Sequence, residues 1–294
     1  MNNNFSGVHT ALITPFNQDK SVDYESLEIL INEQIKHVDG IVILGTTGES
    51  PTISPSESKQ IIDLAVKIAK NKVKIIVGTG SNDTKTAQAK SKLAEDLGAD
   101  AVLSVNPYYN KPTQKGMYQH FTEIANSINI PVILYNIKGR TSVNIDIDTL
   151  VKLTKHSNII GVKEASGDLP QIMNVLNKVD HNFHVISGDD GLTYPIMCLG
   201  GAGVISVVSN IFPSEMKSLV QSCVNNNFIH ARQIHYKLNN FMNALLSISS
   251  NPIPVKTILA YLGKIKEEFR LPLCSIESDA KRTLIQIYED YLND

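Results

Sequence analysis

Residues 131–163 read PVILYNIKGRTSVNIDIDTLVKLTKHSNIIGVK and contain two short apolar runs, the first ending in Tyr135 and the second in Lys163. Apolar runs of this kind recur every ~20 to 35 residues along the chain. Eight of them are candidate strands: VHTALIT from Val8, GIVILG from Gly40, VKIIVG from Val73, ADAVLSV from Ala99, PVILY from Pro131, NIIGVK from Asn158, FHVIS from Phe183 and AGVISV from Ala202. Strands that are apolar almost throughout are typical of a parallel sheet covered by helices.

Helix-period stretches lie between these runs, such as Tyr24 to His37 and Ser56 to Lys70, and several begin with residues that cap helices. Eight alternations favour closure of the sheet into a barrel. An open doubly wound sheet would need a glycine-rich phosphate loop after its first strand, and ITPFNQDK stands there instead. The expected class is therefore α/β, a (β/α)8 TIM barrel with a C-terminal helical extension.

The alternation stops after the eighth run. Residues 214–225, 228–247, 255–262 and 277–292 are expected to be helical, and the second of these stretches carries an apolar stripe that is more typical of core than of a cofactor site. We divide the chain into a barrel, residues 1–225, and a helical extension, residues 226–294.

Composition excludes several classes of function. The chain has 294 residues and a net charge of −2 with acids and bases interspersed, which indicates neither a nucleic acid nor a membrane as partner. The N-terminus lacks a signal-peptide pattern and no apolar run approaches a membrane span, so we expect a cytoplasmic protein. Cys198, Cys223 and Cys274 are widely spaced, and we interpret them as small buried hydrophobes. The histidine spacings do not suggest a metal site.

Polar residues follow the apolar runs directly, at the strand ends where barrel enzymes place their chemistry. Lys163 closes an apolar strand, so its amine either reaches water or is neutral in a lined pocket, where it is a nucleophile. Tyr135 is either a core aromatic or a proton carrier.

The other strand ends allow two readings each. Thr46 and Thr47 with their flanking glycines form either a turn and helix cap or a seat for a small carboxylate. Arg140 either forms a surface ion pair or binds a carboxylate with two parallel hydrogen bonds from its guanidinium. The Asp189-Asp190 pair is best explained as a helix cap.

The motifs GTTGES, PYYNKP, YN followed by GRT, GVKEAS, SGDD, GGAGVISV, NPIPVK and RLPL occur in the order seen in the 4-hydroxy-tetrahydrodipicolinate synthase family, which the chain resembles over essentially its whole length. The resemblance implies condensation of pyruvate with L-aspartate 4-semialdehyde in the diaminopimelate route to lysine. It implies a Schiff base between Lys163 and pyruvate, with no separate cofactor and no metal.

The resemblance also implies roles for further residues. Tyr135 would be the proton donor and acceptor, joined through Thr46 to Tyr109 in a hydroxyl relay. Pyruvate's carboxylate would contact Thr47 and the main chain at Ile205, Gly188 would line the substrate pocket, and Arg140 would bind the aldehyde substrate. Tyr109 would reach in from a neighbouring subunit of a homotetramer or homodimer.

The chain departs from the family pattern in two places. Lys138 replaces the usual proline before Arg140, which leaves the loop that carries the arginine with less pre-organisation. In the cleft where lysine inhibits sensitive family members, Ser50, Asn82 and Tyr108 match, whereas the remaining positions are filled by Pro55, Ser58 and Thr86. We therefore expect weak or absent inhibition by lysine.

Two rival functions remain open from the sequence. Another pyruvate-dependent aldolase, cleaving N-acetylneuraminate or a keto-deoxy sugar acid, would share Lys163 and Tyr135 but not the arginine. A non-catalytic barrel that senses a keto acid would retain the pocket without turnover.

Overall fold

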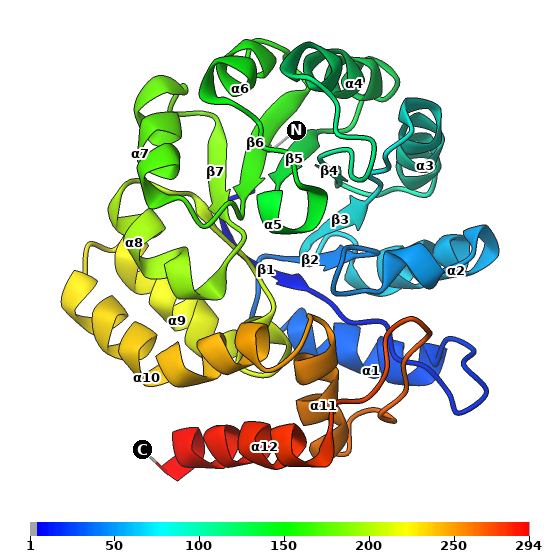
Figure 1. Cartoon of the computed structure of the whole chain (residues 1–294), viewed down its shortest axis with the longest axis vertical. Coiled ribbons are helices and arrows are strands. Elements are labelled where there is room, and N and C mark those ends of the chain that lie inside the picture. Colours follow the sequence, from blue (N-terminus) through cyan, green and yellow to red (C-terminus); the bar gives the residue numbers. More distant parts are fainter. Residues whose placement is uncertain (1–4, 294) are drawn as a thin grey trace.

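A computed structural model describes residues 5–293 of the chain, and within them eight parallel strands close into a barrel in sequence order (Figure 1). The strands are β1 (Gly7–Ala11), β2 (Gly40–Ile43), β3 (Lys74–Gly78), β4 (Ala101–Val105), β5 (Val132–Asn136), β6 (Ile159–Glu164), β7 (His184–Ser187) and β8 (Gly203–Ser206). Hydrogen bonds between β1 and β8 close the ring. The expected (β/α)8 barrel with a helical extension is confirmed.

Helices surround the barrel. They are α1 (Tyr24–Gln34), α2 (Pro55–Ala69), α3 (Thr84–Asp96), α4 (Gln114–Asn126), α5 (Lys138–Thr141), α6 (Ile147–Leu153), α7 (Leu169–Lys178), α8 (Thr193–Cys198) and α9 (Pro213–Val224), with short 3-10 turns η1 (Ser50–Thr52), η2 (Asp190–Leu192) and η3 (Val208–Asn210). The start of α2 shows how sequence sets a boundary, since Ser54 and Glu57 form a reciprocal capping box around Pro55.

Side chains of each strand alternate between two apolar layers. One layer fills the barrel and includes Val42, Ile133, Tyr135 and Ile205. The other lies between the strands and the helices. Because both faces of every strand are covered, the strands are apolar almost throughout, and polar residues appear where the strands end.

The extension consists of α10 (Phe228–Ser247), α11 (Ile253–Tyr261) and α12 (Ser278–Asn293), gathered at one side of the barrel near α1 and α9 (Figure 1). Phe212, just before α9, meets Phe241 of α10 edge to face and Tyr291 of α12 at 4.3 Å between ring centroids. The α10 stripe is core where it meets the barrel, at Ala231, Leu238, Phe241 and Leu245. The division at residue 225 stays a proposal, and residues 1–4 and 294 lie outside the described residues.

The prediction for the cysteines is wrong at two of three positions. Cys223 is buried, whereas Cys198 and Cys274 are exposed. Cys198 is the last residue of α8 and Cys274 lies in the connection before α12, so neither faces the core. Across residues 5–293 no helix has the length and apolarity that crossing a membrane requires.

Candidate active site

Tyr135 and Lys163 lie side by side at the ends of β5 and β6. The two strands pair in register at this point, after a register shift between Val132 and Ile133 that brings the lysine level with the tyrosine. The lysine Nζ lies 4.3 Å from the centroid of the Tyr135 ring. Both residues are 6% exposed. The strand ends therefore present an amine and a phenol together inside the mouth of the barrel.

Gly188 follows β7 and lies against the Lys163 side chain. A Cβ at this position would be 2.9 Å from Lys163 Cε and 2.7 Å from Ala165 Cβ. Such contacts are far shorter than van der Waals distance, so only glycine leaves room for the lysine in its present position.

Thr46 and Thr47 lie in the turn between β2 and η1. Thr47 is buried, and its Oγ1 accepts a hydrogen bond of 3.0 Å from Asn251 Nδ2 in the extension. Glu49, two residues later, has a φ of 54°, an unusual left-handed conformation for a residue other than glycine. The turn is thus held by contacts outside itself.

Arg140 belongs to α5, a single helical turn that ends at Ser142 with a φ of 60°. The sequence suggested a loop around this arginine; the structure closes that loop into a turn in which the Ser142 N–H donates to Lys138 O. Arg140 Nη2 donates to the main-chain oxygen of Asn251 at 3.1 Å. A cavity of about 320 Å³ opens between these residues and is lined in part by Thr46, Tyr108, Arg140 and Asn251.

A buried amide and carboxylate network lies behind the two strand ends. Asn136 and Glu164, which directly follow Tyr135 and Lys163, point to the outer side of the barrel, where Asn136 Nδ2 donates to both carboxylate oxygens of Glu164. Asn106 Nδ2 donates to Asn136 Oδ1 at 2.9 Å. Burial raises the pKa of Glu164, while the hydrogen bonds from Ser166 and Asn136 oppose that rise. The network fixes β4, β5 and β6 relative to one another.

The Asp189-Asp190 pair splits into two roles. Asp189 caps η2 by accepting from the Gly191 N–H, as predicted. The prediction is wrong for Asp190, which is buried and accepts from the N–H groups of Val207 and Val208 at 2.9 and 3.1 Å. Burial raises the pKa of Asp190 to about 6. Its carboxylate therefore ties the exit of β8, next to Ile205, to the exit of β7.

Tyr109 lies apart from these residues. It is 90% exposed and has a φ of 72°. Among the hydrogen bonds of residues 5–293, none joins Tyr109, Thr46 and Tyr135. A single chain places the Lys163 amine beside the Tyr135 ring and, separately, joins Thr47 and Arg140 through Asn251. Within the described residues, no hydrogen bond joins Tyr109 to either group.

Residues 4–290 match the dihydrodipicolinate synthetase family. The chain belongs to this family. It is 50% identical over 289 residues to the 4-hydroxy-tetrahydrodipicolinate synthase of Endomicrobium trichonymphae, with 98% of each chain covered. The dihydrodipicolinate synthase of Aquifex aeolicus superposes with a TM-score of 0.95 at 43% identity, covering 98% of each chain. A dihydrodipicolinate synthase variant described as monomeric gives a TM-score of 0.95 at 39% identity, covering 98% of this chain and 97% of the other.

Three residues near this family site were missed by sequence reasoning: Asn251, Glu49 and Lys256. The motifs NPIPVK and GTTGES contain them, but no local pattern indicates that these two segments, about 200 residues apart, are joined by hydrogen bonds. Within the part of the chain that the structure describes, His, Cys, Asp and Glu form no cluster of three or more that could hold a metal ion.

Proposed function

We infer that the chain is a 4-hydroxy-tetrahydrodipicolinate synthase that condenses pyruvate with L-aspartate 4-semialdehyde, toward diaminopimelate and lysine. The observation that carries this inference is the buried Lys163 amine beside the Tyr135 ring, at the strand ends of a barrel that belongs to this family. The amine can form an imine and the neighbouring phenol can carry the protons that imine chemistry moves, and both lie where barrel enzymes act.

The proposed reaction begins when Lys163 Nζ attacks the ketone carbon of pyruvate and water leaves. The protonated imine then acts as an electron sink, so the methyl group loses a proton and becomes an enamine carbon. That carbon attacks the aldehyde of the second substrate, and the new alkoxide takes up a proton. The amine of the second substrate displaces Lys163 as the ring closes. No metal or external cofactor is needed, because the imine itself withdraws the electrons.

The remaining residues of the proposed site bind and orient the substrates and carry protons. Pyruvate's carboxylate is placed between Thr47 and the main chain at Ile205, and Gly188 keeps the wall beside the lysine open. Tyr135 carries protons to and from the reacting carbon and oxygen. Arg140 lines the cavity, and its guanidinium is suited to the carboxylate of the semialdehyde.

We propose that Tyr109 completes the site of a second copy of the chain, in a homodimer or homotetramer. Its 90% exposure leaves the ring free to enter a neighbouring barrel. There it would join Thr46 and Tyr135 in a hydroxyl relay, which passes a proton without separating charge. We place the enzyme in the cytoplasm, where its biosynthetic substrates would be found.

Regulation by lysine is proposed to be weak. Ser50, Pro55 and Ser58 line one small cavity of about 120 Å³ beside α2. None of the three offers the carboxylate that an effector with two amines would need. Half-inhibition at sub-millimolar lysine would contradict this.

The function is tested by measuring pyruvate consumption with L-aspartate 4-semialdehyde, beside cleavage of N-acetylneuraminate and keto-deoxy sugar acids. Turnover with the semialdehyde alone is expected. Turnover only with a sugar acid would mean that the second substrate was wrongly assigned. Pyruvate binding without any turnover would favour a sensor.

A further inference from the structure

Asn251, between α10 and α11, contacts two separate parts of the site. Its side-chain Nδ2 donates to Thr47 Oγ1 at 3.0 Å, and its main-chain oxygen accepts from Arg140 Nη2 at 3.1 Å. Thr47 follows β2 and Arg140 follows β5, so one residue of the extension bridges two barrel segments that bear different substrate-binding groups.

The direction of the bond to Thr47 determines what its hydroxyl can do. A threonine hydroxyl has one proton to donate and two lone pairs, whereas an amide nitrogen can only donate. Because Asn251 Nδ2 occupies a lone pair of Thr47, the hydroxyl proton is free for another acceptor. The only group proposed to bind there is the carboxylate of pyruvate. A carboxylate accepts hydrogen bonds and cannot donate them.

A buried ion pair holds the extension and the Thr47 turn together. Lys256 of α11 is fully buried, and its Nζ donates to Glu49 Oε1 at 2.6 Å and to the main-chain oxygen of Thr14 at 3.1 Å. The ammonium also lies over the rings of Phe16 and Phe269, 4.3 and 4.9 Å from their centroids. Glu49 is two residues after Thr47, so the pair fixes the turn against the helix that follows Asn251.

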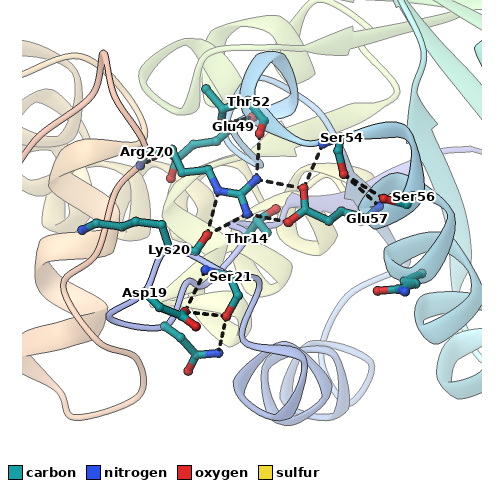
Figure 2. A network of polar contacts seen from close by, with 12 residues as sticks. Thr14, Asp19, Lys20, Ser21, Glu49, Thr52, Ser54, Ser56, Glu57 and Arg270 are labelled. Carbon is teal, nitrogen blue, oxygen red and sulfur yellow. Dashed lines mark hydrogen bonds and ion pairs between the residues drawn. The ribbon is translucent and has the colours of Figure 1, made fainter.

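A second contact lies further out on the same surface (Figure 2). Arg270, in the connection before α12, donates through Nη1 to Glu57 Oε2 at 2.9 Å and to the oxygen of Thr52 at 2.7 Å. Its main-chain N–H reaches Glu49 Oε2 at 3.4 Å. Three residues of the extension, Asn251, Lys256 and Arg270, thus contact the segment between β2 and α2, at Thr47, Glu49 and Thr52.

We propose that Asn251 is a positioning residue of the pyruvate site, which sets the Thr47 hydroxyl as a donor to pyruvate's carboxylate and holds Arg140 through its main-chain oxygen. This inference rests on the proposed function, since it assigns pyruvate to Thr47. Lys256 holds the helix that follows Asn251 against the Thr47 turn through Glu49. Asn251 acts through Thr47 and does not itself touch the reacting atoms.

The test replaces the donor by an acceptor of the same shape. In Asn251→Asp an ionised carboxylate accepts a hydrogen bond from the Thr47 hydroxyl, so that hydroxyl no longer donates to pyruvate. We expect the pyruvate concentration for half-maximal reductive trapping by cyanoborohydride to rise about tenfold at pH 8, the loss typical of one hydrogen bond to a charged group. Asn251→Ala, which removes the donor without adding a charge, should show a smaller rise, about threefold.

Measuring trapping at lower pH should show whether Asn251 orients the Thr47 hydroxyl or only fills space beside it. A protonated carboxyl can donate to Thr47 as the amide does, so the difference between Asn251→Asp and wild type is expected to narrow between pH 8 and pH 5. A difference that stays constant with pH, or no rise in either variant, would overturn the proposal.

Two further variants test whether the effect is specific to Asn251 and passes through Thr47. Asn243 is exposed on α10, so Asn243→Asp should leave trapping unchanged. In a Thr47→Val background, the Asn251→Asp substitution should add almost nothing, because the hydroxyl on which it acts is gone. Additive effects would contradict the proposal. Trapping needs no semialdehyde, so absence of any pyruvate adduct in the wild-type chain would instead refute the proposed function.

Discussion

Two buried lysines have opposite surroundings in this molecule. Lys256, 0% exposed, donates to a carboxylate and a main-chain oxygen. Lys163, 6% exposed, has the face of Tyr135 beside it, and no hydrogen bond to its amine is found among residues 5–293. Removing one partner of a buried ion pair is strongly destabilising, because the other charge is left buried and uncompensated. Because no hydrogen bond within the described residues occupies the Lys163 amine, its nitrogen is available for a substrate, and Lys163 is the lysine that we propose to be reactive.

The largest expected effect comes from removing one partner of the buried Lys256–Glu49 ion pair. Lys256→Met leaves Glu49 buried without its cation and should lower the free energy of unfolding by about 3–5 kcal/mol. Urea denaturation at fixed protein concentration measures it. The double variant Lys256→Met with Glu49→Gln should recover much of that loss. Lys264→Met, which removes a partly exposed pair with Glu33, is the control and should cost about 1 kcal/mol or less. Equal effects of the two lysine variants would contradict the contrast.

The surroundings of Asp190 are intermediate between those of Lys256 and Lys163. One of its carboxylate oxygens accepts hydrogen bonds from two N–H groups, and the other has no hydrogen-bond partner within the described residues. Its folded pKa of about 6 exceeds the ordinary 3.8. Between these values the folded state retains a proton that the unfolded state has lost, so this residue's contribution to stability falls as pH rises from about 4 to about 6. The change is about 3 kcal/mol.

Asp190→Asn cannot titrate and should flatten that part of the stability profile. Urea unfolding at half-unit steps from pH 4 to pH 7 provides the measurement. The prediction concerns how steeply the free energy of unfolding changes with pH, because the amide also changes its absolute value. An unchanged slope would show that the carboxyl does not titrate in this range.

Gly188→Ala should impair the proposed reaction at Lys163 with little effect on the Lys256–Glu49 ion pair. The added methyl displaces the Lys163 side chain, and a misplacement of about 1 Å costs on the order of 100-fold in turnover. Steady-state kinetics compare the variant with Gly116→Ala, whose Cβ would be 3.4 Å from its nearest neighbour, Pro112, and should not affect kcat. Full activity in Gly188→Ala would show that the lysine position is not critical.

Tyr109→Phe should have the smallest effect of the series, about a tenfold loss in kcat, the lower range of a proton-transfer contribution. Imine formation should continue, because the phenol acts after it. Separate measurement of trapping and turnover distinguishes the two steps. Wild-type turnover in this variant would remove the relay from the mechanism.

Sequence alone predicted the barrel because its signal is repeated eight times and each apolar run has a physical cause in a strand buried on both faces. It also predicted that Lys163 and Tyr135 lie at the same edge of the sheet, and the lysine Nζ is 4.3 Å from the centroid of the Tyr135 ring. The joint site with Thr47 and Arg140 stays a prediction. Sequence reasoning missed the partners of Thr47 and Glu49, which lie 204 and 207 residues away in the chain. Its errors at Asp190 and two cysteines arose because single residues carry no information on which face they occupy.

Borohydride reduction in the presence of pyruvate, followed by peptide mass mapping, tests most directly whether the unpaired lysine is the reactive one. We predict one pyruvate-derived adduct, on Lys163, with Lys256 unmodified. In Lys163→Ala the adduct should be absent and turnover should fall by at least about 1,000-fold, as when other covalent nucleophiles are removed. An adduct on another lysine, or one that survives in Lys163→Ala, would contradict the account.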